Sequence, residues 1–166
     1  GNKLSANAKE TLIIAANKVV AYDGEKYDKA DIINLTDEIA PSVKEVVANE
    51  PNAEGNVVIT VTFDEEVTFK DTDKAFIKEY ELIVKRNEGV KKVVYDIVNT
   101  ADDEGNINSD EINIRMTPAQ IGVDRTKFTV TFNGLGIIKD VTEGNKLAKV
   151  TKESDFVENI LHKGAD

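Results

Sequence analysis

Short segments of alternating apolar and polar residues dominate the middle of the chain. Residues 57–63 place four apolar side chains on one face and Thr60 and Thr62 on the other, and residues 112–116 and 127–132 alternate in the same way. A period of two is typical of β-strands with one buried and one solvated face. The pattern predicts three strands with these inward residues: Val57, Ile59, Val61, Phe63, Ile112, Ile114, Met116, Phe128, Val130 and Phe132.

Further strands are indicated by composition and by turn sequences. Residues 79–86 and 90–98 are rich in strand-forming residues, and the Asn87-Glu88-Gly89 turn between them predicts a β-hairpin. Other turn sequences lie at residues 51–56, 102–106 and 133–136. Several short strands with no long helical pattern between them indicate an all-β fold, an antiparallel β-sandwich.

The two ends of the chain follow other patterns. Residues 11–22 are apolar enough for a strand or for a buried helix, and periodicity does not separate the two. A polar loop follows at residues 22–31. Residues 154–164 carry apolar residues at helical spacing, with Ser154 as N-cap and Gly164 as C-cap, which predicts a short C-terminal helix.

A near-duplicate connects the two ends. Residues 1–10 are GNKLSANAKE and residues 144–153 are GNKLAKVTKE, so GNKL and a later Lys-Glu recur 143 positions later. Repetition of this kind indicates one unit of a tandem array, with the end of the preceding unit attached. We therefore expect three parts: a remnant of the preceding module plus linker at 1–40, a module at 41–150 that begins at Pro41, and a helix or linker at 151–166.

Composition narrows the possible functions. The 166 residues fit one ordinary domain with an appendage. A net charge of −10 disfavours nucleic acid as a partner, and no apolar run is long enough for direct membrane insertion. The absence of cysteine excludes disulfides, zinc–cysteine sites and thiol catalysis. A local basic cluster of Lys85, Arg86, Lys91 and Lys92 is interpreted as a solvated hairpin tip.

Five segments in order resemble the bacterial Ig-like domains of S-layer and other cell-surface proteins. They are APSVKEVVANEP (40–51), VVITVTFDEEV (57–67), INIRMTP (112–118), KFTVTF (127–132) and GIIKDVTEGNKL (136–147). The resemblance implies an Ig-like antiparallel β-sandwich of Greek-key type, an extracellular location at the bacterial cell surface, and a structural role without enzymatic activity. It also implies neighbouring modules of the same protein, or like chains in a surface lattice, as partners.

The chain departs from that family pattern at a few places. Glu143 stands where a small residue is usual, and Val141-Thr142 replaces an apolar-Ala pair. The segment between Phe69 and Tyr80 is longer and more charged than the family pattern implies. These departures concern the subfamily.

The strongest candidate site is an acidic loop at residues 100–111, TADDEGNINSDE. Aligned to a twelve-residue calcium loop with Gly105 at the sharp turn, it places oxygen-bearing side chains on or near ligand positions. The predicted calcium ligands are Asp102, Glu104, Asn106, Asn108 and Glu111. Thr100 occupies the first ligand position and the flanks are strand-like, so the alternative is an acidic hairpin turn.

A second acidic group lies at the expected junction between modules. Carboxylates there could hold a cation that stiffens the joint, or could simply keep a linker soluble. The residues concerned are Asp23, Glu25, Asp28, Asp31, Asp37 and Glu38. The Asp140…Gly144-Asn145 sequence near the other end is interpreted as a tight structural turn rather than a binding site.

Catalytic patterns are weak in this sequence. The single histidine, His162, lies at the end of the predicted helix, where it would favour the negative helix end. Glu65 and Glu66 are adjacent in an alternating strand, so they would point to opposite faces and not converge on a substrate. We therefore expect a non-enzymatic spacer or lattice module; the alternative is an adhesion or carbohydrate-binding accessory module of a surface-attached enzyme.

Overall fold

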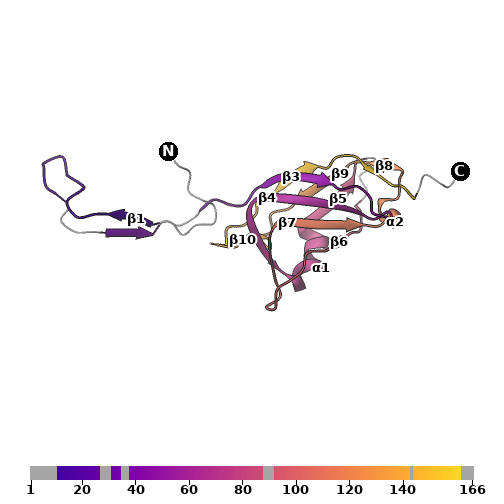
Figure 1. Ribbon diagram of the computed structural model, residues 1–166, viewed down its shortest axis with the longest axis horizontal. Helices are drawn as coiled ribbons and strands as arrows, with labels where there is room; N and C mark the ends of the chain where they lie inside the picture. The colour runs from indigo at the N-terminus through magenta and orange to yellow at the C-terminus, as the bar shows by residue number, and fades with distance from the viewer. Residues whose placement is uncertain (1–10, 27–30, 35–37, 88–91, 143, 162–166) are drawn as a thin grey trace.

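The computed structural model describes residues 11–26, 31–34, 38–87, 92–142 and 144–161. Most of its regular structure is β-strand, in antiparallel sheets (Figure 1). The strands are β1 Thr11–Ile14, β2 Asp31–Asn34, β3 Val43–Ala48, β4 Val57–Lys70, β5 Leu82–Arg86, β6 Asp96–Ile97, β7 Asn106–Met116, β8 Arg125–Thr126, β9 Phe128–Phe132, β10 Lys139–Asp140, β11 Val150–Glu153 and β12 Val157–Glu158. The helical segments are η1 Asp71–Asp73, α1 Lys74–Phe76, η2 Ile77–Glu81 and α2 Pro118–Ile121.

The first sheet is organised around the long strand β4. One edge of β4 pairs with β3 along its first half and with β10 near its end, while the other edge pairs with β7. Strand β6 completes this sheet on the outer side of β7. Because a single strand carries three partners, β4 joins the beginning, the middle and the last third of the main body.

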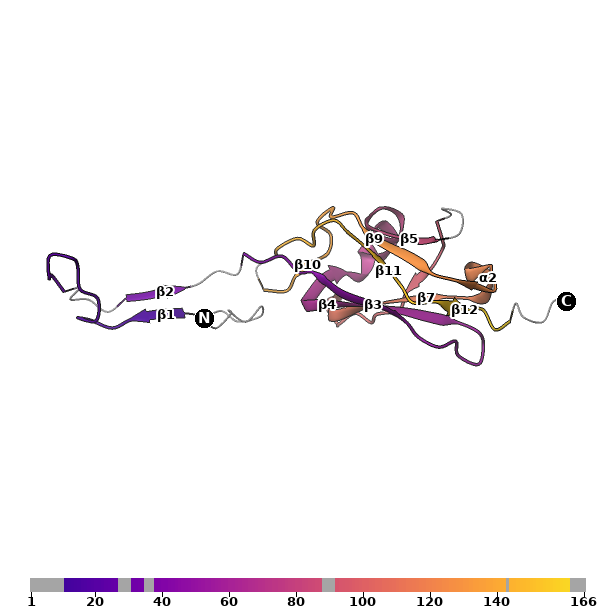
Figure 2. The same cartoon turned by 90° about the horizontal axis from the view of Figure 1, so that it is seen from above.

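The second sheet has the order β11–β9–β5. Strand β8 directly precedes β9 and β12 follows β11, so the short β12–β8 pair continues the pairing of the same two segments of the chain. Figure 2 shows β5 and β9 on one side of the body and β3, β4 and β7 on the other. One apolar core lies between them, to which both sheets contribute. At its centre the rings of Phe63 and Phe132 meet edge to face, with 5.8 Å between centroids. Such a geometry is favoured between aromatic quadrupoles.

The predicted inward faces are confirmed. All ten apolar residues assigned to the inside of residues 57–63, 112–116 and 127–132 are buried. Thr60, Thr62, Thr129 and Thr131, on the opposite faces, are partly exposed. The all-β prediction is confirmed with them.

The predicted hairpin of residues 79–86 and 90–98 is wrong in two respects. Residues 77–81 form the π-helical segment η2, so β5 begins only at Leu82. The following segment starts beside β5, where Lys85 pairs with Lys92 and the Val93 N–H donates to Val84, but it then crosses to the first sheet as β6. Burial explains the crossing, because Val93, Tyr95 and Ile97 all enter the core.

The predicted helix at residues 154–164 is also wrong over its described part, which ends at Leu161. Residues Val157–Glu158 form strand β12 and pair with β8. Ser154, Val157 and Asn159 are buried, whereas Phe156, Ile160 and Leu161 are exposed. The apolar residues that suggested a helical stripe therefore lie mostly on the surface, and tertiary pairing overrides the local spacing.

Residues 11–14, for which strand and helix were both open, form strand β1. It pairs with β2 as a separate two-stranded sheet, with Ile13 opposite Ile32. Both views draw this hairpin beyond one end of the main body (Figures 1 and 2). Within the described part of the chain, no helical segment has the length and hydrophobicity needed to cross a membrane.

A buried tyrosine connects the two sheets. The Tyr95 hydroxyl, on the segment leading into β6, donates to the carbonyl oxygen of Leu82 in β5 at 2.5 Å. Burial raises the pKa of this hydroxyl, because the phenolate would be poorly solvated. The hydroxyl therefore stays protonated and able to donate.

We predict that Tyr95→Phe lowers the free energy of unfolding by about 1–2 kcal/mol, because it leaves a buried carbonyl without its donor. Urea denaturation followed by circular dichroism measures this. Tyr80→Phe is the matched control, since Tyr80 is half exposed, and it should change stability little. Equal effects of the two substitutions would contradict the assignment.

Candidate functional site

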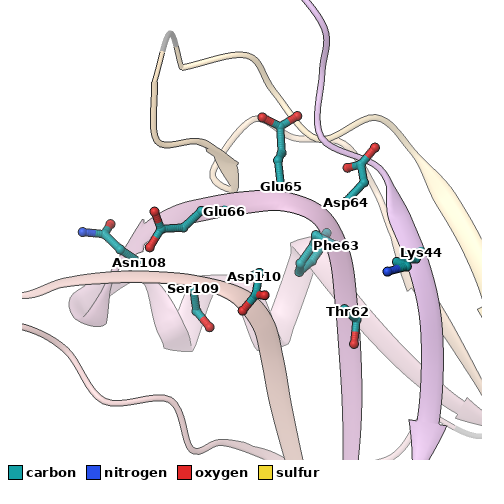
Figure 3. Close-up of a pocket in the computed structure, with 9 residues that line it drawn as sticks. All are labelled: Lys44, Thr62, Phe63, Asp64, Glu65, Glu66, Asn108, Ser109 and Asp110. Atoms are coloured by element: carbon teal, nitrogen blue, oxygen red, sulfur yellow. The ribbon is translucent and has the colours of Figure 1, made fainter. Parts of the chain in front are cut away.

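An acidic depression lies where β4 changes register. Between Thr62, opposite Glu111, and Val67, opposite Ser109, four residues of β4 face a single residue of β7. This β-bulge bends the strand and opens a depression of about 640 Å³ (Figure 3). Its lining is rich in oxygen atoms: Lys44, Thr62, Phe63, Asp64, Glu65, Glu66, Asn108, Ser109 and Asp110.

Asp64 in this bulge holds the start of the body in place. Its carboxylate accepts hydrogen bonds from the Ser42 backbone N–H at 2.7 Å and from the Ser42 hydroxyl at 2.8 Å. The Asp64 N–H in turn donates to the Ser42 carbonyl at 3.1 Å. Three hydrogen bonds thus fix Ser42 directly after Pro41, at the position where the chain enters the first sheet.

The other carboxylates of the depression do not converge on one point. Glu65 is buried and Glu66 is half-buried, and Figure 3 shows the two side chains pointing in different directions. The two side chains therefore do not converge (Figure 3), as the sequence predicted. The backbone carbonyl of Glu66 accepts from the Val141 N–H at 3.2 Å, so the bulge also supports the loop after β10.

The structure spreads the predicted calcium ligands along the chain. Asp102 and Glu104 lie in the turn before β7, while Asn106, Asn108 and Glu111 lie along β7 itself. A β-strand advances about 3.3 Å per residue, so Glu111 lies roughly 16 Å along the strand from Asn106. The five residues are therefore not brought together, and within the described ranges no group of three or more His, Cys, Asp or Glu residues is arranged to hold a metal ion.

Asp102 instead closes the turn. Its Oδ1 accepts from the backbone N–H groups of Glu104 at 3.0 Å and Asn106 at 2.8 Å, and its Oδ2 accepts from the Asn106 amide at 3.3 Å. The pKa of this carboxyl is lowered, and the main cause is the hydrogen bond from the Asn106 N–H, which stabilises the charged form. Gly105 supplies the positive φ of 77° that the turn requires.

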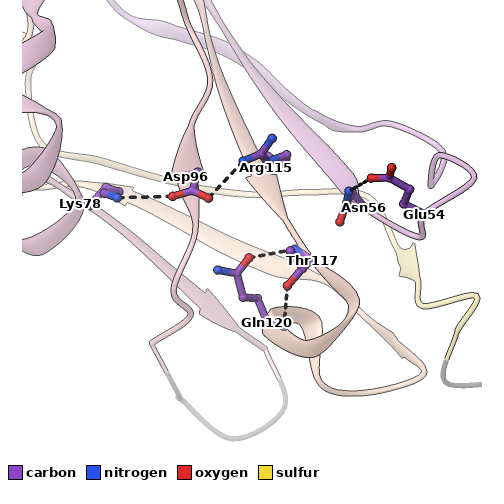
Figure 4. Close-up of polar contacts among 7 residues, drawn as sticks. All are labelled: Glu54, Asn56, Lys78, Asp96, Arg115, Thr117 and Gln120. Atoms are coloured by element: carbon purple, nitrogen blue, oxygen red, sulfur yellow. Dashed lines mark hydrogen bonds and ion pairs between the residues drawn. The ribbon is translucent and has the colours of Figure 1, made fainter.

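The same turn occurs a second time at residues 52–56. There Asn52 Oδ1 accepts from the N–H groups of Glu54 at 3.0 Å and Asn56 at 2.9 Å, and Gly55 has a φ of 75°. The Asn56 amide also donates to Glu54 (Figure 4). Asn and Asp serve alike, because the turn needs only a side-chain oxygen on its first residue that accepts from the backbone N–H two residues later. The shared x-Glu-Gly-Asn sequence carries this information.

A related turn follows β10, as the sequence predicted. Asp140 is buried, and its two carboxylate oxygens accept from the N–H groups of Gly144 and Asn145, both at 2.9 Å. Glu81 holds the preceding loop in the same manner, accepting from the N–H groups of Gly134 at 2.9 Å and Leu135 at 2.7 Å. Sequence reasoning missed Glu81, since it lies in a segment predicted to be a strand.

The junction carboxylates are described only in part. Asp28 and Asp37 lie outside the described residues, as does the side chain of Asp31. Asp23 closes a local turn by accepting from the Glu25 N–H at 3.1 Å. His162 also lies outside the described residues.

The basic cluster contributes to the fold. Arg86 is half-buried and its Nη1 donates to the Ile121 carbonyl at 3.1 Å, at the end of α2. Lys92 lies 3.5 Å from a carboxylate oxygen of Glu79 and donates to the Glu79 carbonyl. The interpretation as a solvated tip is wrong for Arg86, whereas Lys92 is exposed; Lys91 lies outside the described residues.

Polar contacts also attach the helical segments to the sheets (Figure 4). Asp96 of β6 lies 3.5 Å from Lys78 of η2 and 3.4 Å from Arg115 of β7. Thr117 and Gln120 form a capping box around the start of α2. The exposed ion pairs contribute little stability, so these contacts chiefly fix orientation.

An aromatic and basic patch lies beside the β12–β8 pair. The half-exposed ring of Phe156 lies under the Arg125 guanidinium at 4.1 Å and the Lys127 ammonium at 4.9 Å. A cation over an exposed ring contributes roughly 0.5–1 kcal/mol. This contact fixes Phe156 on the surface, although its hydrophobic character would favour burial.

No protein-family model matches this chain, and neither a curated protein nor a solved structure matches it.

We predict that Asp102→Asn preserves the turn, because an amide oxygen can accept the same backbone hydrogen bonds, as Asn52 does. The stabilisation from ionised Asp102 is fully present above the unfolded pKa of about 3.9 and is lost as the pH falls through its lowered folded pKa. Thermal unfolding from pH 6 to pH 2 should therefore show a shallower acid loss for Asp102→Asn than for the wild type.

The control for this experiment is Asp102→Ala, which removes the acceptor and should lower the melting temperature at neutral pH. Parallel acid profiles for the wild type and Asp102→Asn would contradict the role of the ionised carboxylate.

We further predict that Ser42→Ala destabilises the body by about 1 kcal/mol, because it removes one hydrogen bond to a carboxylate. Chemical denaturation measures the loss, and hydrogen exchange should locate it at β3. A loss of protection elsewhere, with β3 unchanged, would show that Ser42 does not secure the start of the sheet.

Proposed function

We propose that this chain is a non-enzymatic structural module of a bacterial cell-surface or S-layer protein, which acts as a spacer or lattice element in a tandem array. The fold we propose is an Ig-like sandwich. The orders β3–β4–β7–β6 and β11–β9–β5 correspond to the ABED and GFC sheets of the seven-stranded Ig arrangement. The resemblance of residues 40–147 to surface Ig-like domains supports the same proposal.

The observation that carries this proposal is the path of the chain through the body. The chain enters where β3 begins, which we call the proximal end, and leaves beyond β12, which we call the distal end; the two ends are opposite (Figures 1 and 2). Modules connected in this way follow one another in line. The repeat of residues 1–10 at 144–153 supports such a succession of units.

The connection at the proximal end is suited to a spacer. Pro41 is buried and Ser42 is held by Asp64, so the body fixes the direction in which the linker leaves. A fixed exit limits bending between neighbours, which a flexible linker would allow. This geometry supports a role in spacing.

The alternative of a carbohydrate-binding or adhesion module is favoured by one observation. Phe76 and Tyr80 on the helical segments are half exposed, with 4.8 Å between ring centroids. Exposed aromatic rings can stack on sugar rings. Binding to a glycan array that is lost in Phe76→Ala and Tyr80→Ala would support this alternative over the spacer role.

We predict that two copies joined in the register of the repeat form an elongated particle. The proposed joined chain is residues 1–166 followed by residues 24–166, because Asp166 lies 143 positions after Asp23. Small-angle X-ray scattering should show a radius of gyration about twice that of the single chain. Side-by-side packing would give a compact particle with twice the number of residues. Its radius of gyration would be only about 1.3-fold larger than that of the single chain, and this result would contradict the spacer role.

A further inference from the structure

We propose that Asn133-Gly134, directly after β9, is a site of spontaneous deamidation that the fold keeps closed, and that Glu81 is the residue that closes it. An asparagine followed by glycine meets the least steric resistance to this reaction, because glycine has no Cβ beside its nitrogen. The dipeptide occurs once in the 166 residues. This inference is independent of the proposed spacer role.

The reaction needs no partner other than water. The Gly134 backbone nitrogen gives up its proton to solvent and attacks Cγ of Asn133, so that a new C–N bond closes a five-membered succinimide ring. The bond from Cγ to Nδ2 breaks, and the amide nitrogen takes up a proton and leaves as ammonia. Water then opens the ring at either carbonyl, which yields aspartate or isoaspartate at position 133.

The fold requires this dipeptide for structural reasons. Gly134 has a φ of 73°, and a Cβ there would lie 2.8 Å from the backbone nitrogen of Lys149. The side-chain amide of Asn133 donates to the Tyr80 carbonyl at 2.6 Å, and the Asn133 N–H donates to the Glu81 carbonyl at 2.8 Å. Packing thus fixes the glycine and hydrogen bonding fixes the asparagine, so the chain carries a reactive pair in its native loop.

The Glu81 side chain opposes the first step. It is buried, and its Oε1 accepts from the Gly134 N–H at 2.9 Å while its Oε2 accepts from the Leu135 N–H at 2.7 Å. Removal of the Gly134 proton would break a hydrogen bond to a carboxylate. It would also place a second negative charge beside the first, away from water, where like charges repel strongly. The attacking nitrogen is therefore held in its unreactive, protonated form.

The Tyr80 carbonyl opposes the second step. The Asn133 side chain must turn its Cγ toward the Gly134 nitrogen, and this movement breaks the hydrogen bond to η2. Both contacts have to open together, and local openings of this kind are rare in proportion to the contacts that they cost. The product would not fit the same place, because a carboxylate at position 133 has no donor for the Tyr80 carbonyl. Isoaspartate would also add a carbon to the backbone between β9 and β11.

The test follows Asn133 in the full chain by peptide mass spectrometry, with chromatographic separation of aspartate and isoaspartate. Samples are incubated in mildly alkaline buffer, one folded and one unfolded in urea. Conversion should be at least about tenfold slower in the folded chain. In folded Glu81→Gln it should be at least about fivefold faster than in the folded wild type, because a neutral amide holds the Gly134 N–H less strongly.

Two variants control for charge and for stability. Glu79→Gln makes the same change on an exposed side chain of η2 and should react like the wild type. Thr117→Ala removes the capping box of α2 and lowers stability in another part of the fold. An increase in Thr117→Ala equal to that in Glu81→Gln would show that unfolding of the whole body exposes Asn133, and would overturn the local role of Glu81.

Other results also decide against the proposal. Equal conversion of the folded and unfolded wild type would overturn the closed site. Unchanged or slower conversion in Glu81→Gln would overturn the protective role, and slower conversion would make Glu81 a base that promotes the reaction. If Glu81→Gln does not fold, hydrogen exchange of the Gly134 amide in the wild type replaces it. That amide should exchange at least about tenfold more slowly than in the unfolded chain, and unprotected exchange would overturn the proposal.

Discussion

The bulge in β4 is the constraint on which the rest of the body depends. Four residues opposite one on β7 turn the strand, so that its edge meets β3 before the bulge and β10 after it. The bulge also places Asp64 against Ser42 and the Glu66 carbonyl against Val141. One local irregularity therefore connects the beginning of the body to the loop between β10 and β11.

Four acidic residues serve this architecture directly. Asp64, Glu81, Asp102 and Asp140 each accept backbone N–H groups of loops or turns. Charged acceptors form stronger hydrogen bonds than neutral ones, so a carboxylate can order a loop that has little regular structure. The long connection from β9 to β11 is held in this way. In the acidic loop that suggests calcium binding in sequence, Asp102 accepts hydrogen bonds from the backbone of its own turn.

The sequence predicted strands well where one face is buried and the other is wet, as in residues 57–63 and 127–132. It failed where burial and local spacing disagree. Residues 154–161 have helical spacing but pair with β8, and residues 93–98 leave their hairpin partner to fill the core. Of the candidate site, the turn at Asp140 was predictable from its local sequence. The β4 bulge was not, because register depends on the partner strand.

The central claim is that the body unfolds as one mechanical unit, because a single core joins both sheets and the chain enters and leaves the body at opposite ends (Figures 1 and 2). Pulling a single molecule from its two ends tests it most directly. The account predicts one cooperative unfolding event for residues 43–158, which releases on the order of 40 nm of chain. Gradual extension without a force peak, or two separate events for the two sheets, would contradict the claim.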